Sequence, residues 1–236
     1  MVSLENRIKR ILFDADDTLW ENNLFYMEAN ANFFDLLGEG GFGEEEISKE
    51  FDALEMKVIK ERGYGSINYI YILEELFAKY NKLCGGKLNE ERLRDIIERF
   101  MEHPVQKPLV FDRVEETLNC LREKYKLFIL TKGDKEEQSG KIIRSGLDKF
   151  VEDYFVLPEK SDKEYRVLLE RFNWKAHETC MVGNSPKSDI NPALRNGMYA
   201  IYIPYHDTWK VDMEPIENST QRLIELRNFA ELKTVL

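Results

Sequence analysis

Residues 7–19 read Arg7-Ile8-Lys9-Arg10-Ile11-Leu12-Phe13-Asp14-Ala15-Asp16-Asp17-Thr18-Leu19. The run becomes continuously apolar up to Phe13 and then stops at a polar cluster, which is typical of a buried parallel strand and its carboxyl end. Asp14 therefore falls at the tip of a strand. Similar short apolar runs recur along the chain between charged amphipathic segments of helical length, so the sequence predicts a parallel sheet with alternating helices. These further runs occupy residues 127–130, 154–157, 179–182 and 199–203.

A different pattern fills residues 20–107. Apolar residues recur there at helical spacing, and Gly-containing breaks such as residues 38–43 and 62–65 separate the periodic segments. The sequence thus predicts an α/β domain formed by residues 1–19 and 108–236, with a small α-helical domain inserted at residues 20–107. The four helices expected in the insert lie at residues 25–37, 47–59, 67–83 and 88–101.

The composition is that of a soluble globular protein of one or two domains, with 236 residues, 43% hydrophobic and 33% charged. A formal net charge of −10 would repel nucleic acid and anionic membranes, so we expect neither as a partner. No apolar run approaches the roughly 20 residues of a membrane span, and the N-terminus lacks the pattern of a signal peptide. The three cysteines form no close pair, which suits free thiols and a cytoplasmic location. They are Cys84, Cys120 and Cys180.

The segment from Asp14 to Thr18 carries the strongest chemical signal. Asp14 and Asp16 lie two residues apart directly after a strand, where the chain turns and where ligands of open α/β sheets bind. One carboxylate can attack phosphorus while the other donates a proton to the leaving oxygen. An acidic turn in which Thr18 caps the next segment is the alternative interpretation.

With this motif the chain resembles the haloacid dehalogenase superfamily, whose further motifs can be sought along the sequence. The second motif of that family is a Ser or Thr at the end of the second core strand, and Thr131 stands at that position, followed by Lys132 and Gly133. The resemblance implies that the Thr131 hydroxyl and the following backbone N–H groups hold a phosphoryl oxygen. A helix N-cap is the other interpretation of Thr131.

The two remaining motifs of the family are a lysine and an acidic metal-binding segment. Lys160 and Lys163 both follow the apolar run 154–157, and Lys160 lies nearer the strand end. The acidic motif matches the segment from Gly183 to Asp189, but Asn184 stands where the family usually has its first Asp. An amide oxygen can ligate a hard cation with one negative charge less, which leaves Asp189 as the main acidic ligand. An ordinary turn followed by a helix cap is the alternative.

Four segments in the family's order, each at an expected strand end, extend the resemblance from about residue 7 to residue 203. The resemblance implies a Rossmann-like parallel sheet with a helical cap domain inserted after the first motif. It also implies a Mg²⁺-dependent phosphatase that acts on a small phosphorylated metabolite. The sequence indicates neither the identity of that substrate nor the oligomeric state.

The roles implied by the family are specific. Asp14 is the nucleophile that forms an aspartyl-phosphate, Asp16 is the general acid and base, and Lys160 with Thr131 stabilises the equatorial oxygens. Mg²⁺ would be held by Asp14, the backbone carbonyl of Asp16 and Asp189, with Asn184 as a further candidate. The list of phosphate-binding candidates also includes Lys132 and Gly133.

Other activities of the same family stay open at this point. A phosphonatase would need a cap lysine, for which Lys57 or Lys60 could serve, and a phosphomutase shares the core carboxylates. A dehalogenase fits less well, because it does not need an acid at Asp16. A non-catalytic binding module on the same fold is supported only by Asn184.

The turn Arg62-Gly63-Tyr64-Gly65 joins two expected helices of the insert. Because a Gly-flanked aromatic beside an arginine suits a loop that contacts a ligand, we expect Tyr64 and Arg62 to contact the leaving group of the substrate. An ordinary turn with Tyr64 packed on the helices and Arg62 in solvent is the alternative.

Overall fold

The computed structural model describes residues 4–5, 7–103, 106–217 and 221–236. It divides into two compact units, here called the core unit, Met1–Asn23 with Pro108–Leu236, and the helical unit, Leu24–Lys107. No helix in the described part of the chain is long and apolar enough to cross a membrane.

A six-stranded parallel sheet in the order β3-β2-β1-β4-β5-β6 forms the centre of the core unit. The five strands predicted from the sequence are present, although β1 begins at Arg10 rather than Arg7. The sixth strand, β6, is a short, partly exposed edge strand that was not predicted from the sequence. The bounds are β1 Arg10–Phe13, β2 Lys126–Lys132, β3 Asp153–Leu157, β4 Thr179–Gly183, β5 Tyr199–Tyr202 and β6 Leu223–Glu225.

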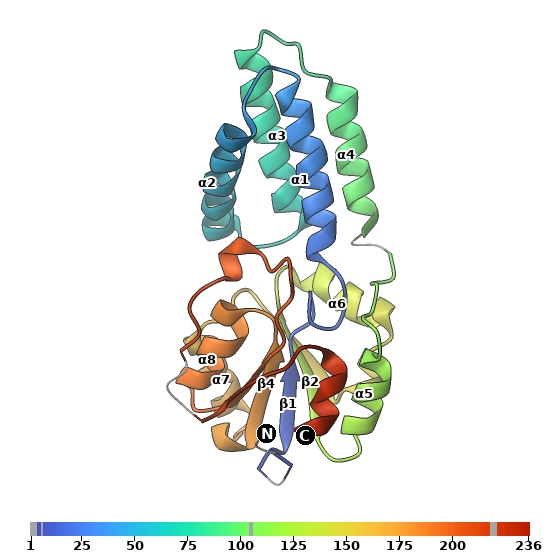
Figure 1. The fold of residues 1–236 in the computed structure, drawn as a ribbon, viewed down its shortest axis with the longest axis vertical. Helices are drawn as coiled ribbons and strands as arrows, with labels where there is room; N and C mark the ends of the chain where they lie inside the picture. Colours follow the sequence, from blue (N-terminus) through green and yellow to red (C-terminus); the bar gives the residue numbers. More distant parts are fainter. Residues whose placement is uncertain (1–3, 6, 104–105, 218–220) are drawn as a thin grey trace. The chain divides into compact units, whose positions relative to one another are not determined.

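Helices cover both faces of this sheet (Figure 1). The alternation of side chains along β1 explains why, because Ile11 and Phe13 pack on one face and Leu12 on the other. Helices α5 and α6 contribute to the first core, and α7 and α8 to the second. Their bounds are α5 Val114–Leu121, α6 Lys135–Ser145, α7 Asp162–Arg171 and α8 Asn191–Arg195, with shorter helical turns at η2 Asp148–Phe150, η3 Ala176–Glu178, η4 Pro186–Ile190, η5 Lys210–Asp212 and η6 Phe229–Thr234.

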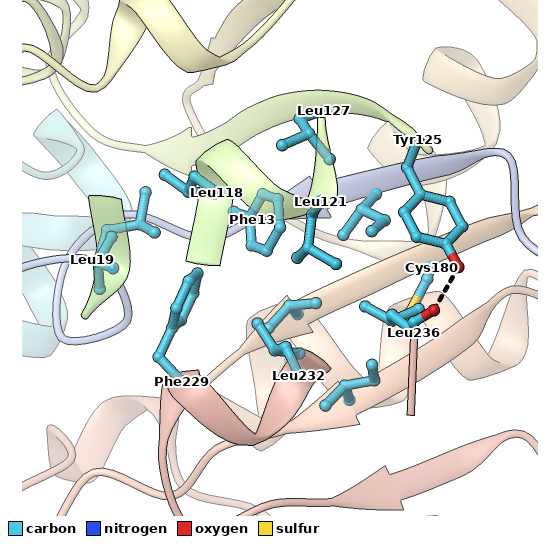
Figure 2. Close-up of a cluster of buried hydrophobic side chains, with 14 of the residues drawn as sticks. Phe13, Leu19, Leu118, Leu121, Tyr125, Leu127, Cys180, Phe229, Leu232 and Leu236 are labelled. Carbon is cyan, nitrogen blue, oxygen red and sulfur yellow. Dashed lines mark hydrogen bonds between the residues drawn. The ribbon is translucent and has the colours of Figure 1, made fainter. Parts of the chain in front are cut away.

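The first of these cores reaches from the strand tips to the end of the chain (Figure 2). Phe13 packs against Phe229 of η6 with ring centroids 5.5 Å apart. The hydroxyl of Tyr125 donates a hydrogen bond of 2.7 Å to the carbonyl oxygen of Leu236. Phe13 is fully buried in this core. Its tight packing holds the backbone of the next residue, Asp14, in a fixed position.

Four helices make up the helical unit, as the periodicity predicts, and they enclose an apolar core of their own. The bounds are α1 Asn23–Gly38, α2 Glu44–Arg62, α3 Ser66–Leu83 and α4 Glu90–Glu102. Asn89 caps α4 by accepting hydrogen bonds from the N–H groups of Glu91 and Arg92. Gly63 ends α2 with a φ of 84°, a conformation that favours glycine.

The strand order places a site at one edge of the sheet. The chain runs from β1 outward to β2 and β3, and then returns to the other side of β1 to form β4. Ligands in open parallel sheets bind outside the carboxyl ends of the strands at such a reversal. The reversal lies between β1 and β4, directly beside Asp14 and Asn184.

Candidate active site

The four motif segments meet at the carboxyl edge of the sheet. Asp14 follows β1, Thr131 is the next-to-last residue of β2, Lys160 follows β3 and Asn184 follows β4. These four strands are consecutive neighbours in the sheet, and all four side chains are buried. Polar groups that are buried together at the end of a sheet need partners, and here Lys160 contacts Asp14 while the Thr18 hydroxyl lies within hydrogen-bond distance of Asn184.

Lys160 joins the two buried carboxylates of the site. Its Nζ lies 2.5 Å from Asp14 Oδ1 and 2.5 Å from Asp189 Oδ1. Burial alone would lower the pKa of Lys160, but the two carboxylates raise it well above its ordinary value, so the side chain carries a positive charge. The other lysine considered from the sequence, Lys163, is exposed on α7.

Asp14 is held through both carboxylate oxygens. Oδ1 contacts Lys160, and Oδ2 accepts a hydrogen bond of 3.0 Å from Thr18 Oγ1. Burial raises the pKa of Asp14, and the Lys160 ammonium opposes this effect. Burial likewise raises the pKa of Asp189 to about 7, with the charge of Asp14 adding to it. The site therefore combines two crowded carboxylates with one ammonium group.

Asp16 lies in a separate network on the neighbouring loop. Its Oδ1 accepts a hydrogen bond of 2.7 Å from Trp20 Nε1 and lies 2.5 Å from Lys141 Nζ, and its Oδ2 accepts one of 2.9 Å from Gln138 Nε2. Burial would raise the pKa of Asp16, but Lys141 and these hydrogen bonds lower it. None of the three partners was predicted from the sequence, and for Gln138 and Lys141 the reason is that polar residues on an amphipathic helix such as α6 ordinarily face solvent.

A tight loop after β4 orients Asp189. The backbone N–H of Ser185 donates a hydrogen bond of 2.9 Å to Asp189 Oδ2. A Cβ atom at Gly183 would lie only 2.2 Å from the same oxygen, so glycine is required for this close approach. Ser185 also caps the following turn by accepting a hydrogen bond of 3.0 Å from the N–H of Ser188.

The oxygen atoms of this site suit a hard cation. Asp14 Oδ2 and Asn184 Oδ1 both lie near Thr18 Oγ1, at 3.0 and 3.2 Å, and its single hydroxyl proton can satisfy only one of them at a time. Within the described residues, no three His, Cys, Asp or Glu side chains form a metal cluster. Mg²⁺ commonly takes one or two carboxylates, with water and substrate phosphate completing its shell, so the donor set fits this ion.

Two of the expected phosphate contacts have other partners in the structure. The ammonium of Lys132 donates to Ser188 Oγ at 2.7 Å and to Asp212 Oδ1 at 2.6 Å. The N–H of Gly133 donates to the carbonyl oxygen of Leu157 at 2.9 Å. A role in phosphate binding for Lys132 and Gly133 thus stays a prediction. It requires that each residue give up these partners and contact phosphate instead.

Arg62 and Tyr64 belong to the helical unit. Arg62 is exposed at the end of α2, and its guanidinium carbon lies 3.7 Å from the ring centroid of Tyr71. Tyr64 is half-buried in the turn before α3. Their contact with a substrate stays a prediction.

Comparison with known proteins finds a matching family and similar proteins. A family model described as haloacid dehalogenase-like hydrolase matches residues 8–197. The glyceraldehyde 3-phosphate phosphatase of Pyrococcus furiosus is 28% identical over 236 residues, covering 96% of this chain and 93% of that protein.

Two solved structures share the fold over nearly the whole chain. A haloacid dehalogenase-like family hydrolase from Xanthomonas campestris has a TM-score of 0.80 and 26% identity, and the match covers 97% of this chain and 94% of that one. The putative hydrolase YfnB from Bacillus subtilis, solved with bound magnesium, has a TM-score of 0.61 and 22% identity, with coverage of 98% and 99%.

Proposed function

This chain belongs to the haloacid dehalogenase-like hydrolases and is a phosphatase, and we propose that it hydrolyses small phosphomonoesters with Mg²⁺ through a phosphoryl group carried on Asp14. The observation that supports the proposal most strongly is the buried contact of Asp14 with Lys160 at 2.5 Å. A carboxylate at a strand tip that faces a fixed positive charge can approach an anionic phosphoryl group, which an isolated carboxylate would repel.

The first half of the proposed reaction forms the phosphoenzyme. A carboxylate oxygen of Asp14 attacks phosphorus, and the bond from phosphorus to the ester oxygen breaks. The electron pair stays on the leaving oxygen, which takes a proton from Asp16. Lys160 and the Thr131 hydroxyl lie at the same edge of the sheet and stabilise the phosphoryl oxygens.

In the second half, Asp16 accepts a proton from water as the water oxygen attacks phosphorus. The bond from phosphorus to Asp14 breaks, which releases phosphate and restores the carboxylate. Lys141 and the other donors overcome the effect of burial and lower the pKa of Asp16, which favours the ionised form that accepts the proton at this stage. Proton donation in the first half requires the protonated form, which the same contacts disfavour.

Mg²⁺ would be held by Asp14, the backbone carbonyl of Asp16, Asn184 and Asp189. When bound, it neutralises charge and aligns the phosphoryl group. The Thr18 hydroxyl can donate to only one of the oxygens Asp14 Oδ2 and Asn184 Oδ1 at a time, so the other is left to bind a cation, which supports this assignment. The magnesium-bound relative YfnB makes Mg²⁺ the first cation to test.

For the substrate, we infer a small phosphorylated metabolite. Glyceraldehyde 3-phosphate is the first compound to test, because relatives carry that activity in their name.

The helical unit would act as a cap that selects the leaving group, with Arg62 and Tyr64 in the turn between α2 and α3. The names of the relatives favour hydrolysis over the phosphonatase and mutase alternatives. The three cysteines are free, which supports a cytoplasmic location.

Replacement of the nucleophile tests this proposal. Asp14→Asn should abolish phosphate release while the variant stays folded and still binds phosphate esters, since the substitution keeps the side-chain volume. The matched control is Asp153→Asn, an exposed residue at the start of β3, which should keep wild-type turnover. Substantial hydrolysis by pure Asp14→Asn would contradict the covalent mechanism.

A further inference from the structure

We propose that Lys141 is a positioning residue, which fixes the carboxylate of Asp16 and ties it to the segment that leads into α1. Its Nζ lies 2.5 Å from Asp16 Oδ1 and 2.8 Å from Asn22 Oδ1. The Lys141 side chain is only 7% exposed. A lysine ordinarily keeps its ammonium in water, so such burial calls for strong partners, and these two supply them.

The helix α6 fixes the direction of the Asp16 carboxylate. Gln138 and Lys141 lie three residues apart and therefore share one face of this helix. Gln138 donates to Oδ2 of Asp16 and Lys141 to Oδ1, so both oxygens are bound from the same face. A carboxylate held at both oxygens loses its rotational freedom, which aims it at one point in the site.

The second partner of Lys141 belongs to a segment that is itself fixed. The backbone N–H groups of Asn22 and Asn23 donate hydrogen bonds of 2.8 and 2.9 Å to Asp17 Oδ1. Asp17 holds a φ of 61°, an uncommon conformation for a residue with a side chain. Lys141 thus connects the acid and base of the proposed reaction with the chain segment just before the inserted helices.

The inference rests on the proposed phosphatase reaction, and it predicts a specific kinetic signature. Proton donation by Asp16 matters most for a poor leaving group, such as the alcohol of an alkyl phosphate. Lys141→Met should therefore lower kcat for an alkyl phosphate by about 10²-fold, the effect of a misplacement of roughly 1 Å. The activated ester p-nitrophenyl phosphate should lose much less.

A double-mutant cycle separates positioning from independent roles. If Lys141 acts through Asp16, Lys141→Met should add little to the loss caused by Asp16→Asn. The inhibition constant for orthovanadate, a probe of the phosphoryl site, should stay unchanged. Lys135→Met, at an exposed lysine of the same helix, is the matched control and should behave as the wild type.

Three results for Lys141→Met would overturn the inference. They are equal losses of kcat for both esters, the same loss of kcat in the wild-type and Asp16→Asn backgrounds, or weaker inhibition by orthovanadate. Because Lys141→Met can also unfold the core, Asn22→Ala provides a second variant at a half-buried position. It should give a smaller loss with the same dependence on the leaving group, and no change would refute the link to this segment. Failure of the wild type to release phosphate from either ester would instead refute the proposed function.

Discussion

Gly183→Ala should lower phosphatase turnover by about 10²-fold, because the added methyl group would displace the carboxylate of Asp189. A Cβ atom at this position would lie 2.2 Å from Asp189 Oδ2 and 2.4 Å from its Cγ. Attractive contacts between such atoms begin near 3.5 Å, so the carboxylate must move by about 1 Å or more. Such a shift breaks the contacts of Asp189 with Lys160 and with the N–H of Ser185, and a misplacement of this size costs about 10²-fold in rate.

The assay is kcat for p-nitrophenyl phosphate at saturating Mg²⁺, combined with thermal unfolding. Overpacking should also reduce the free energy of unfolding by about 1–3 kcal/mol. Gly38→Ala is the control, since a Cβ there meets nothing within 4 Å. In an Asp189→Gly background, Gly183→Ala should cost little further stability, because the clashing side chain is gone. Unchanged turnover and stability in Gly183→Ala would show that the carboxylate of Asp189 does not depend on glycine at this position.

Three further substitutions test the metal site, the buried Asp17 and the turn that contains Tyr64. Asn184→Asp should lower the Mg²⁺ concentration for half-maximal rate by about tenfold, roughly 1.4 kcal/mol of binding, because it adds a charged ligand; an unchanged Mg²⁺ dependence would place Asn184 outside the metal shell. Burial raises the pKa of Asp17 to about 8, above its unfolded value near 4, so its contribution to stability falls as pH rises through this window. Asp17→Asn removes this pH-dependent loss of stability. In urea unfolding at pH 5 and pH 8, the free energy of unfolding of Asp17→Asn should exceed that of the wild type by more at pH 8. An equal difference at both pH values would contradict this prediction. Tyr64→Ala should lower kcat/KM about tenfold for the native substrate and leave p-nitrophenyl phosphate unaffected, whereas equal effects would remove Tyr64 from the specificity turn.

The sheet could be predicted from the sequence to the extent that its strands are buried on both faces. Strands β1 and β4 are almost wholly buried, and each appears as a continuous apolar run that stops at polar residues. The edge strand β6 has only three residues, Leu223–Glu225, and none is fully buried, so no apolar run distinguishes it. The helical insert was recognisable because each of its helices keeps one apolar face.

Individual residues of the site could be predicted from the sequence, but their contacts with one another could not. Asp14, Lys160 and Asp189 could each be selected because they follow an apolar run, but the bridging of two carboxylates by one lysine depends on the order of strands in space. Lys141 and Gln138 could not be selected, since nothing in a helical segment marks a polar residue as buried. The contact of Lys132 with Asp212, 80 residues later in the chain, could not be predicted from the sequence either.

In the proposed reaction, Asp14 carries the phosphoryl group during turnover. Rapid acid quenching of the enzyme during turnover, followed by proteolysis and mass spectrometry, measures this directly. We expect one added phosphoryl group on the peptide that contains Asp14, formed at a rate no slower than turnover and absent from Asp14→Asn. Phosphate release by the wild type with no phosphoryl group on that peptide at any quench time would contradict it.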